Sequence, residues 1–149
     1  PYMAPAPYHN MYGPESFTPV ARRKKEQENP NPVYKMFMEE QVGITFSKQG
    51  TRETVLPGYM GLIKQIDDHL GDLFDFLDRE GKTDETMIVF TSDHGDYLGD
   101  HWMGEKELFH DVSVKIPLII VDPRKSADKT RGTNSNDFVE TIDLLQTFI

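Results

Sequence analysis

Apolar residues recur at three- and four-residue spacing between Leu62 and Leu77, with polar residues between them. This spacing places the apolar side chains on one face of a helix, so it predicts an amphipathic helix. We expect the helix to begin after Pro57 and Gly58 and to end at Gly81, because these residue types interrupt helices. With the usual helical repeat it would have about six turns.

Two short, continuous apolar runs follow this helix, at Thr86–Thr91 and Ile116–Val121. Runs of this kind are typical of strands covered on both faces of a parallel sheet. A helix, a buried strand, a polar loop and a second buried strand together indicate an α/β sheet layered by helices rather than a sandwich. A last helix is predicted over residues 141–149, capped by Thr141 or Asp137.

The remaining segments show no clear helical or strand pattern of apolar residues. Most of the prolines lie in residues 1–32, with tyrosines and phenylalanines between them, which excludes a regular helix or a central strand there. We favour an ordered surface segment over a disordered linker, because aromatic residues are scarce in disorder. Residues 33–57 show a mixed pattern, and the polar stretch 122–136 predicts a loop.

Composition narrows the function. The chain has 149 residues and a formal net charge of −9, which disfavours nucleic-acid binding, and the basic run Arg22–Lys25 is too short to reverse this. The absence of cysteine excludes disulfides, thiolate zinc sites and a cysteine nucleophile, and leaves the localisation unknown. No apolar run approaches the roughly 18 to 20 residues that span a bilayer, so no membrane segment is predicted.

Both ends of the sequence suggest that it is part of a larger protein. The first residue is Pro1 rather than a methionine, and no charged and apolar leader follows it. The last apolar helical pattern stops at Ile149 without a glycine, a proline or a polar tail. We therefore expect a piece of a longer chain.

The richest chemistry lies directly after the first predicted strand. Asp93 and His94 follow that strand, and α/β sheets bind their ligands beyond the carboxyl ends of strands. A carboxylate oxygen and an imidazole nitrogen together suit a divalent cation, and Gly95 lets the backbone turn so that both side chains converge. The alternative is an ordinary turn with solvated polar groups.

Three more side chains on the same loop are candidates. Lys106, 13 residues after Asp93, could place a cation beside a metal-bound anion, although a solvated lysine is the simpler explanation. His101 and His110 could position an anion or transfer a proton, or they could be hydrogen-bonded structural histidines. No EF-hand register, H-E-x-x-H, G-x-S-x-G, P-loop or G-x-G-x-x-G motif occurs.

These motifs together resemble one family. Two segments resemble the sulfatase family of the alkaline-phosphatase superfamily. They are V-F-T-S-D-H-G-D-Y-L-G-D-H at 89–101 and K-I-P-L-I-I-V-D-P at 115–123, with Lys106 between them. The segments 59–71 and 141–147 fit the same pattern. The opening P-Y-M-A-P-A-P-Y-H-N-M-Y resembles the phosphonate monoester hydrolase branch and its bacterial arylsulfatase relatives.

The resemblance implies an alkaline-phosphatase-like α/β sheet layered by helices, present here incompletely. It implies that Asp93 and His94 ligate a divalent cation, calcium or manganese, and that Lys106 contacts the non-bridging oxygens of a sulfate, phosphonate or phosphate ester. His101 and His110 are candidates for substrate contact or proton transfer. The family's nucleophile is a formylglycine made in a C/S-x-P-x-R motif, which this sequence lacks.

The expected organisation is a partial catalytic domain, with a Pro- and Tyr-rich cleft-rim segment at 1–57 and a helix–strand–metal loop–strand–helix core at 58–149. We expect a metal-dependent hydrolase of sulfate, phosphonate or phosphate monoesters or diesters that is inactive as this piece alone. Its partners would be a small-molecule ester and the remainder of its own catalytic domain, with a homo-oligomer left open. The alternative is a non-catalytic anion- or metal-binding module that retains half of a sulfatase-like site.

Overall fold

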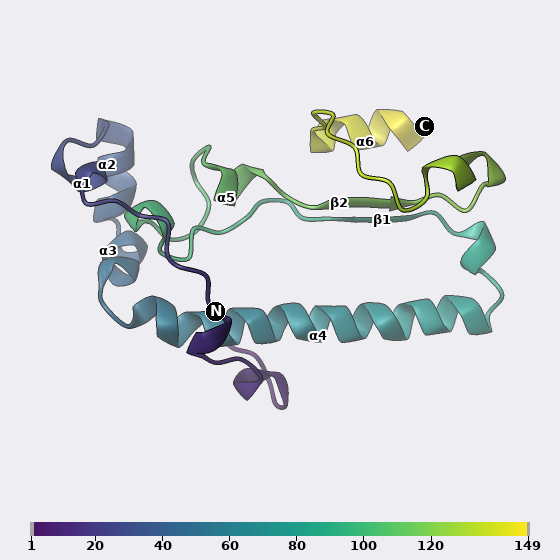
Figure 1. The fold of residues 1–149 in the computed structure, drawn as a ribbon, viewed down its shortest axis with the longest axis horizontal. Helices are drawn as coiled ribbons and strands as arrows, with labels where there is room; N and C mark the ends of the chain where they lie inside the picture. Colours follow the sequence, from purple (N-terminus) through teal and green to yellow (C-terminus); the bar gives the residue numbers. More distant parts are fainter. Residues whose placement is uncertain (1, 149) are drawn as a thin grey trace.

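A long helix, α4 (Thr51–Arg79), spans one side of the molecule, and a pair of antiparallel strands lies roughly along the axis of this helix in a separate layer (Figure 1). Three short helices gather around the beginning of α4, and the last helix, α6 (Thr141–Phe148), lies beyond the strands. The computed structural model describes residues 2–148. Its helices and strands are α1 (Lys25–Glu28), α2 (Pro32–Glu39), α3 (Gln41–Ser47), α4 (Thr51–Arg79), β1 (Ile88–Thr91), α5 (Asp111–Val114), β2 (Leu118–Val121) and α6 (Thr141–Phe148).

The predicted amphipathic helix is confirmed over its length, but its predicted start is wrong. Helix α4 begins at Thr51, so Pro57 and Gly58 lie inside it. Pro57 cannot donate to the carbonyl of Glu53, and because Glu53 is exposed, solvent can satisfy that carbonyl instead. The predicted end is confirmed: Gly81 adopts φ +64 directly after the last turn, and its N–H donates to the carbonyl of Asp78.

The glycines of α4 serve as contact points for the amino-terminal segment. A side chain at Gly58 would overlap the carbonyl oxygen of Tyr2, and one at Gly61 would overlap the carbonyl oxygen of Tyr8. The Tyr8 hydroxyl also donates to the Asp68 carboxylate over 3.0 Å. The segment 2–12 is therefore held against α4, as the predicted ordered surface segment requires.

The two predicted strands are confirmed, but their predicted environment is wrong. Strands β1 and β2 pair antiparallel, with Ile88 opposite Val121 and Thr91 opposite Leu118, because the segment between them turns the chain back. The strands are also far from covered, since Ile119 is 57% exposed and every β2 side chain is exposed. Their apolar sequence is typical of buried strands, but residues 2–148 do not bury them.

The core lies at one end of the molecule, where the loop after β1 packs on α2, α3 and α4. One cluster contains Phe46, Leu56 and Leu98. A second consists of buried residues from the loop, namely Tyr97, Met103 and Leu108. Helices α2 and α3 occupy the segment for which the sequence showed only a mixed pattern.

The last predicted helix is present as α6, with Ile149 outside the described residues. Its first turn is stabilised by the Asp143 carboxylate, which accepts from the backbone N–H of Glu140 at 2.9 Å, rather than by the predicted caps Thr141 or Asp137. None of the described helices is long and apolar enough to cross a membrane.

We predict opposite effects of alanine at two glycines of α4. Gly61→Ala should lower the free energy of unfolding by about 1–3 kcal/mol, because the new methyl group would overlap the Tyr8 carbonyl. Gly71→Ala is the matched control: nothing lies near its added carbon, so better helix propensity should raise the free energy of unfolding by about 0.5–1 kcal/mol. Urea unfolding of both variants measures this. A stabilising Gly61→Ala would contradict the close packing.

Candidate functional site

The loop after β1 carries the candidate residues, and burial holds it in an unusual shape. Leu98, His101, Trp102 and Glu105 all have positive φ angles between 45° and 64°. This left-handed conformation costs roughly 1 kcal/mol or more for a residue with a side chain. The buried ring of Tyr97 and its neighbours in the core offset that cost, so the loop is a fixed structure.

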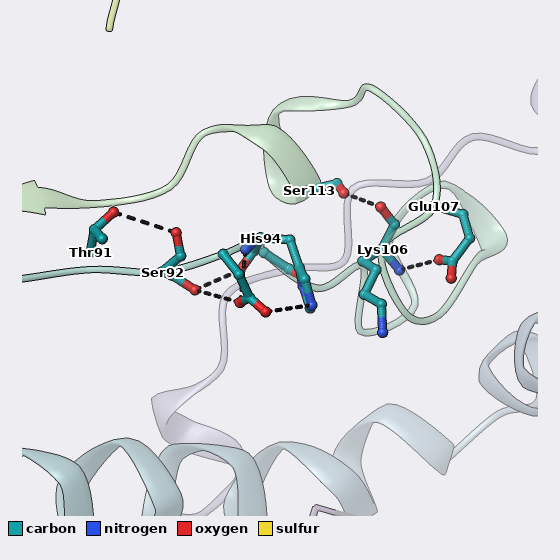
Figure 2. Close-up of polar contacts among 8 residues, drawn as sticks. Thr91, Ser92, His94, Lys106, Glu107 and Ser113 are labelled. Atoms are coloured by element: carbon teal, nitrogen blue, oxygen red, sulfur yellow. Dashed lines mark hydrogen bonds and ion pairs between the residues drawn. The ribbon is translucent and has the colours of Figure 1, made fainter. Parts of the chain in front are cut away.

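Asp93 and His94 lie side by side at the start of the loop. Figure 2 shows His94 there, with Lys106 and Ser113 farther along the same loop. The Nδ1 of His94 is 2.7 Å from the Gly95 carbonyl oxygen, which can only accept, so Nδ1 carries the proton and Nε2 has the free lone pair. That Nε2 is 3.4 Å from Oδ2 of Asp93. The two potential ligand atoms are therefore close to each other.

The carboxylate of Asp93 is kept ionised. The backbone N–H of His94 donates to its Oδ1 at 2.9 Å, and this bond lowers the pKa of Asp93. The Asp93 side chain is 83% exposed, so its second oxygen is accessible from solvent. Asp93 thus presents a charged oxygen beside the Nε2 of His94.

Backbone bridges bring Lys106 close to this pair. The N–H of Gly95 donates to the Ser113 carbonyl at 2.7 Å, and the Ser113 hydroxyl donates to the Lys106 carbonyl. Ser113 is only 2% exposed, so both bonds are protected from water. A side chain at position 95 would overlap the Val112 carbonyl, which explains the glycine there.

His94 and Lys106 line the same hollow, which has a volume of about 380 Å³. Its wall combines acidic, aromatic and apolar side chains from the loop, α4 and the amino-terminal segment, namely Tyr2, Tyr59, Leu62, Asp96 and Glu105. The predicted pair of His94 and Lys106 is thus brought together, with Asp93 beside it.

His101 and His110 lie elsewhere, stacked on each other. Their rings are 4.0 Å apart at an angle of 16°. Nδ1 of His101 is 3.0 Å from the Glu26 carboxylate, and Nδ1 of His110 is 2.9 Å from the Tyr97 hydroxyl. Neither histidine lines the hollow of His94 and Lys106.

Comparison with known proteins identifies the family. The sequence matches the family model described as Sulfatase over residues 2–149. The chain belongs to the sulfatase family. This sulfatase-family chain is 35% identical over 162 residues to the multifunctional alkaline phosphatase superfamily protein PehA of Trinickia caryophylli, an alignment covering 100% of the chain and 31% of PehA. It is 30% identical over 148 residues to an ulvan-active sulfatase of Formosa agariphila, covering 98% of the chain and 24% of that protein.

A solved structure supports the fold. Phosphonate monoester hydrolase SpPMH from Silicibacter pomeroyi superposes with a TM-score of 0.66 and 31% identity, over 80% of this chain and 26% of that one. The sulfatase-family chain therefore has the predicted alkaline-phosphatase-like α/β fold, in part. It spans about a quarter to a third of the length of these relatives.

The donor set of this sulfatase-family chain suits part of a cation site. Two ligand atoms of one cation, each about 2.1–2.6 Å from it, lie about 3.0–3.7 Å apart when their two bonds to the cation form a right angle. The 3.4 Å between His94 Nε2 and Asp93 Oδ2 falls in that range. Among residues 2–148, no group of three or more His, Asp or Glu side chains is arranged to hold a metal ion, so the pair supplies two positions only.

Several residues that shape the site escaped prediction from the sequence. Ser113 had one weak signal, since it is a lone polar residue between two valines in V-S-V. Asp96 stands in the conspicuous string D-H-G-D, yet its bond to the Tyr2 hydroxyl spans 94 residues. Glu26 likewise meets His101 across 75 residues, a separation that no local pattern reveals.

The stacked histidines predict a pH-dependent stability. Burial, and secondly the neighbouring His101, lower the pKa of His110 below its ordinary value of about 6.5. The groups around the pair are Glu26, Tyr34, Tyr97 and Asp111. As pH falls below about 6.5 the unfolded chain binds a proton at position 110 before the folded chain does, so the free energy of unfolding should fall until pH passes the folded pKa.

Urea unfolding between pH 7 and 5 measures this slope. We expect His110→Gln to reduce it, because glutamine can still bond Tyr97 but does not titrate. His69→Gln, at an exposed position of α4, should leave the slope as it is in the wild type. Equal slopes in the wild type and His110→Gln would refute the assignment.

Proposed function

We propose that this chain is the metal- and anion-binding part of a catalytic domain that hydrolyses sulfate, phosphonate or phosphate esters. The observation that carries the proposal is the 3.4 Å approach of His94 Nε2 to Asp93 Oδ2, beside a hollow that His94 shares with Lys106. Membership of the sulfatase family supports the class of reaction.

Asp93 and His94 would hold a divalent cation, calcium or manganese. The imidazole nitrogen favours manganese over calcium as the bound cation, because calcium prefers oxygen ligands. When bound, such a cation polarises an ester oxygen and stabilises the charge that grows on it. The proton on His94 Nδ1, bonded to the Gly95 carbonyl, keeps Nε2 available as a ligand.

Lys106 would place its ammonium group against the non-bridging oxygens of the bound ester. Its backbone is fixed by the Ser113 hydroxyl, while its side chain remains exposed to the hollow. A preorganised charge of this kind contributes about 3 kcal/mol to the stabilisation of the transition state. His101 and His110 remain predicted candidates for proton transfer, although their contacts with Glu26 and Tyr97 favour a role in holding the loop.

The nucleophile would come from another part of the protein. The sequence contains no cysteine and no serine in an S-x-P-x-R string, so the formylglycine of the family has no precursor here. The proposed division into a rim segment, 1–57, and a core, 58–149, is crossed by α4.

The remainder of the same catalytic domain is the proposed partner. The β1–β2 pair and α6 expose large apolar side chains, among them Ile119, Ile142 (70% exposed) and Leu145. Their exposure supports a fold that further strands and helices would cover. This cover would also supply the other ligands of the cation.

We predict that two substitutions in the full-length protein separate metal binding from anion binding. Asp93→Asn should weaken Mn²⁺ binding at least tenfold, because it removes a charged ligand. Lys106→Ala should leave Mn²⁺ binding within about twofold but lower kcat for aryl sulfate or phosphonate ester hydrolysis about 100- to 1,000-fold. Calorimetric titration with Mn²⁺ and steady-state kinetics measure the two effects.

The matched controls are Asp84→Asn and Lys82→Ala, exposed residues between α4 and β1 that should change neither quantity. Unaltered Mn²⁺ binding in Asp93→Asn would refute the proposed cation site. Unaltered hydrolysis in Lys106→Ala would refute the proposed anion contact.

We also predict that the 149-residue chain alone does not hydrolyse these esters, even with Mn²⁺ present, because the nucleophile is missing. Its urea unfolding should show a shallower slope than a complete domain of this length, since much apolar surface is already exposed. Metal-dependent turnover would overturn the idea of a partial domain. A steep cooperative transition without turnover would favour the alternative of a self-sufficient binding module.

A further inference from the structure

One long-range hydrogen bond joins the amino-terminal segment to the loop that carries the candidate ligands. The Tyr2 hydroxyl donates to Oδ2 of Asp96 at 2.7 Å, across 94 residues of sequence. The other oxygen of the same carboxylate, Oδ1, accepts from the backbone N–H of Leu98 at 2.9 Å. Asp96 is therefore held on both sides, two residues after His94.

Tyr2 is itself firmly placed. Its ring packs edge-on against Phe46 and Tyr59, with centroids 6.1 Å and 6.2 Å away. Its carbonyl lies where only a glycine, Gly58, leaves room on α4. Burial, together with the bond to Asp96, raises the pKa of the Tyr2 phenol, so the hydroxyl keeps its proton and remains a donor.

The bond acts on the turn that leads out of the candidate cation site. Leu98 has φ +45, a conformation that a leucine adopts only when its surroundings hold it there. The Asp96 carboxylate pins the Leu98 N–H, and Tyr2 fixes the rotation of that carboxylate. Without the phenol, Asp96 could rotate into solvent, and the segment His94–Leu98 would lose an anchor.

We propose that Tyr2 is a positioning residue for the cation site: acting through Asp96, it holds the His94–Leu98 turn so that His94 Nε2 faces Asp93. This inference rests on the proposed function. Tyr2 and Asp96 also line the hollow that His94 and Lys106 share, so the bond forms part of the wall of the site. It does not touch the reacting atoms.

The test is Tyr2→Phe in the full-length protein, with Tyr8→Phe as the matched control. Both tyrosines belong to the amino-terminal segment, and each donates one hydrogen bond to an aspartate, but Asp68, the partner of Tyr8, lies on α4 outside the site. The probe is Mn²⁺ alone, and the free ion is counted by electron paramagnetic resonance at a temperature where every variant is folded.

We expect Tyr2→Phe to weaken Mn²⁺ binding about tenfold, the usual effect of losing a hydrogen bond behind a ligand, and to broaden the spectrum of the bound ion. Tyr8→Phe should stay within twofold of the wild type. In an Asp96→Asn background, Tyr2→Phe should add less than twofold, because the partner of the phenol is already altered. If Tyr2→Phe does not fold, Asp96→Asn alone should still weaken Mn²⁺ binding about tenfold.

The outcomes separate the inference from the proposed function. Equal Mn²⁺ affinities for Tyr2→Phe and Tyr8→Phe, with Asp93→Asn weakened, would overturn the role of Tyr2 and leave the cation site standing. Wild-type affinity in Asp93→Asn would overturn the proposed site and the inference with it. A full tenfold loss from Tyr2→Phe in the Asp96→Asn background would show that Tyr2 does not act through Asp96.

Discussion

The two hydrogen bonds of Ser113 are the constraint on which the candidate site depends. One joins its carbonyl to the N–H of Gly95, and the other joins its hydroxyl to the carbonyl of Lys106. They close the loop after β1 on itself and bring two distant stretches of backbone together away from water. The lysine and the histidine that share the hollow are neighbours because of these bonds.

The surroundings of the loop then fix its finer geometry. The buried Tyr97 ring packs inside the loop, so packing stabilises the positive φ angles of the loop residues other than Gly99. The Gly95 carbonyl selects the tautomer of His94, and the backbone N–H of His94 bonds the carboxylate of Asp93. The two candidate ligands, Asp93 and His94, are thus each oriented by a main-chain group, which is a rigid support.

Local patterns in the sequence predicted what local physics determines. The spacing of apolar residues predicted most of the length of α4, and the β-branched runs predicted both strands. Asp93 and His94 were located by their position directly after a strand. The start of α4 was mispredicted at Pro57 because the loss of one hydrogen bond is tolerated in a long helix whose Gly58 and Gly61 accept the amino-terminal segment. The direction of strand pairing was mispredicted because composition reports burial, not direction.

What the sequence could not show are contacts between remote segments. The bonds from Tyr2 to Asp96 and from Glu26 to His101 join residues that no periodicity relates. Their partners became visible only once the tertiary structure had placed α1 and the amino-terminal segment over the loop.

The exposed β1–β2 pair has a consequence for synthesis in the cell. Its outer edges offer unpaired backbone groups, and its faces offer isoleucine and valine side chains to any strand that arrives first. Until the proposed remainder of the domain covers the pair, a strand from another nascent chain could take that place. The timing of that cover would then set how much correctly folded protein a cell obtains.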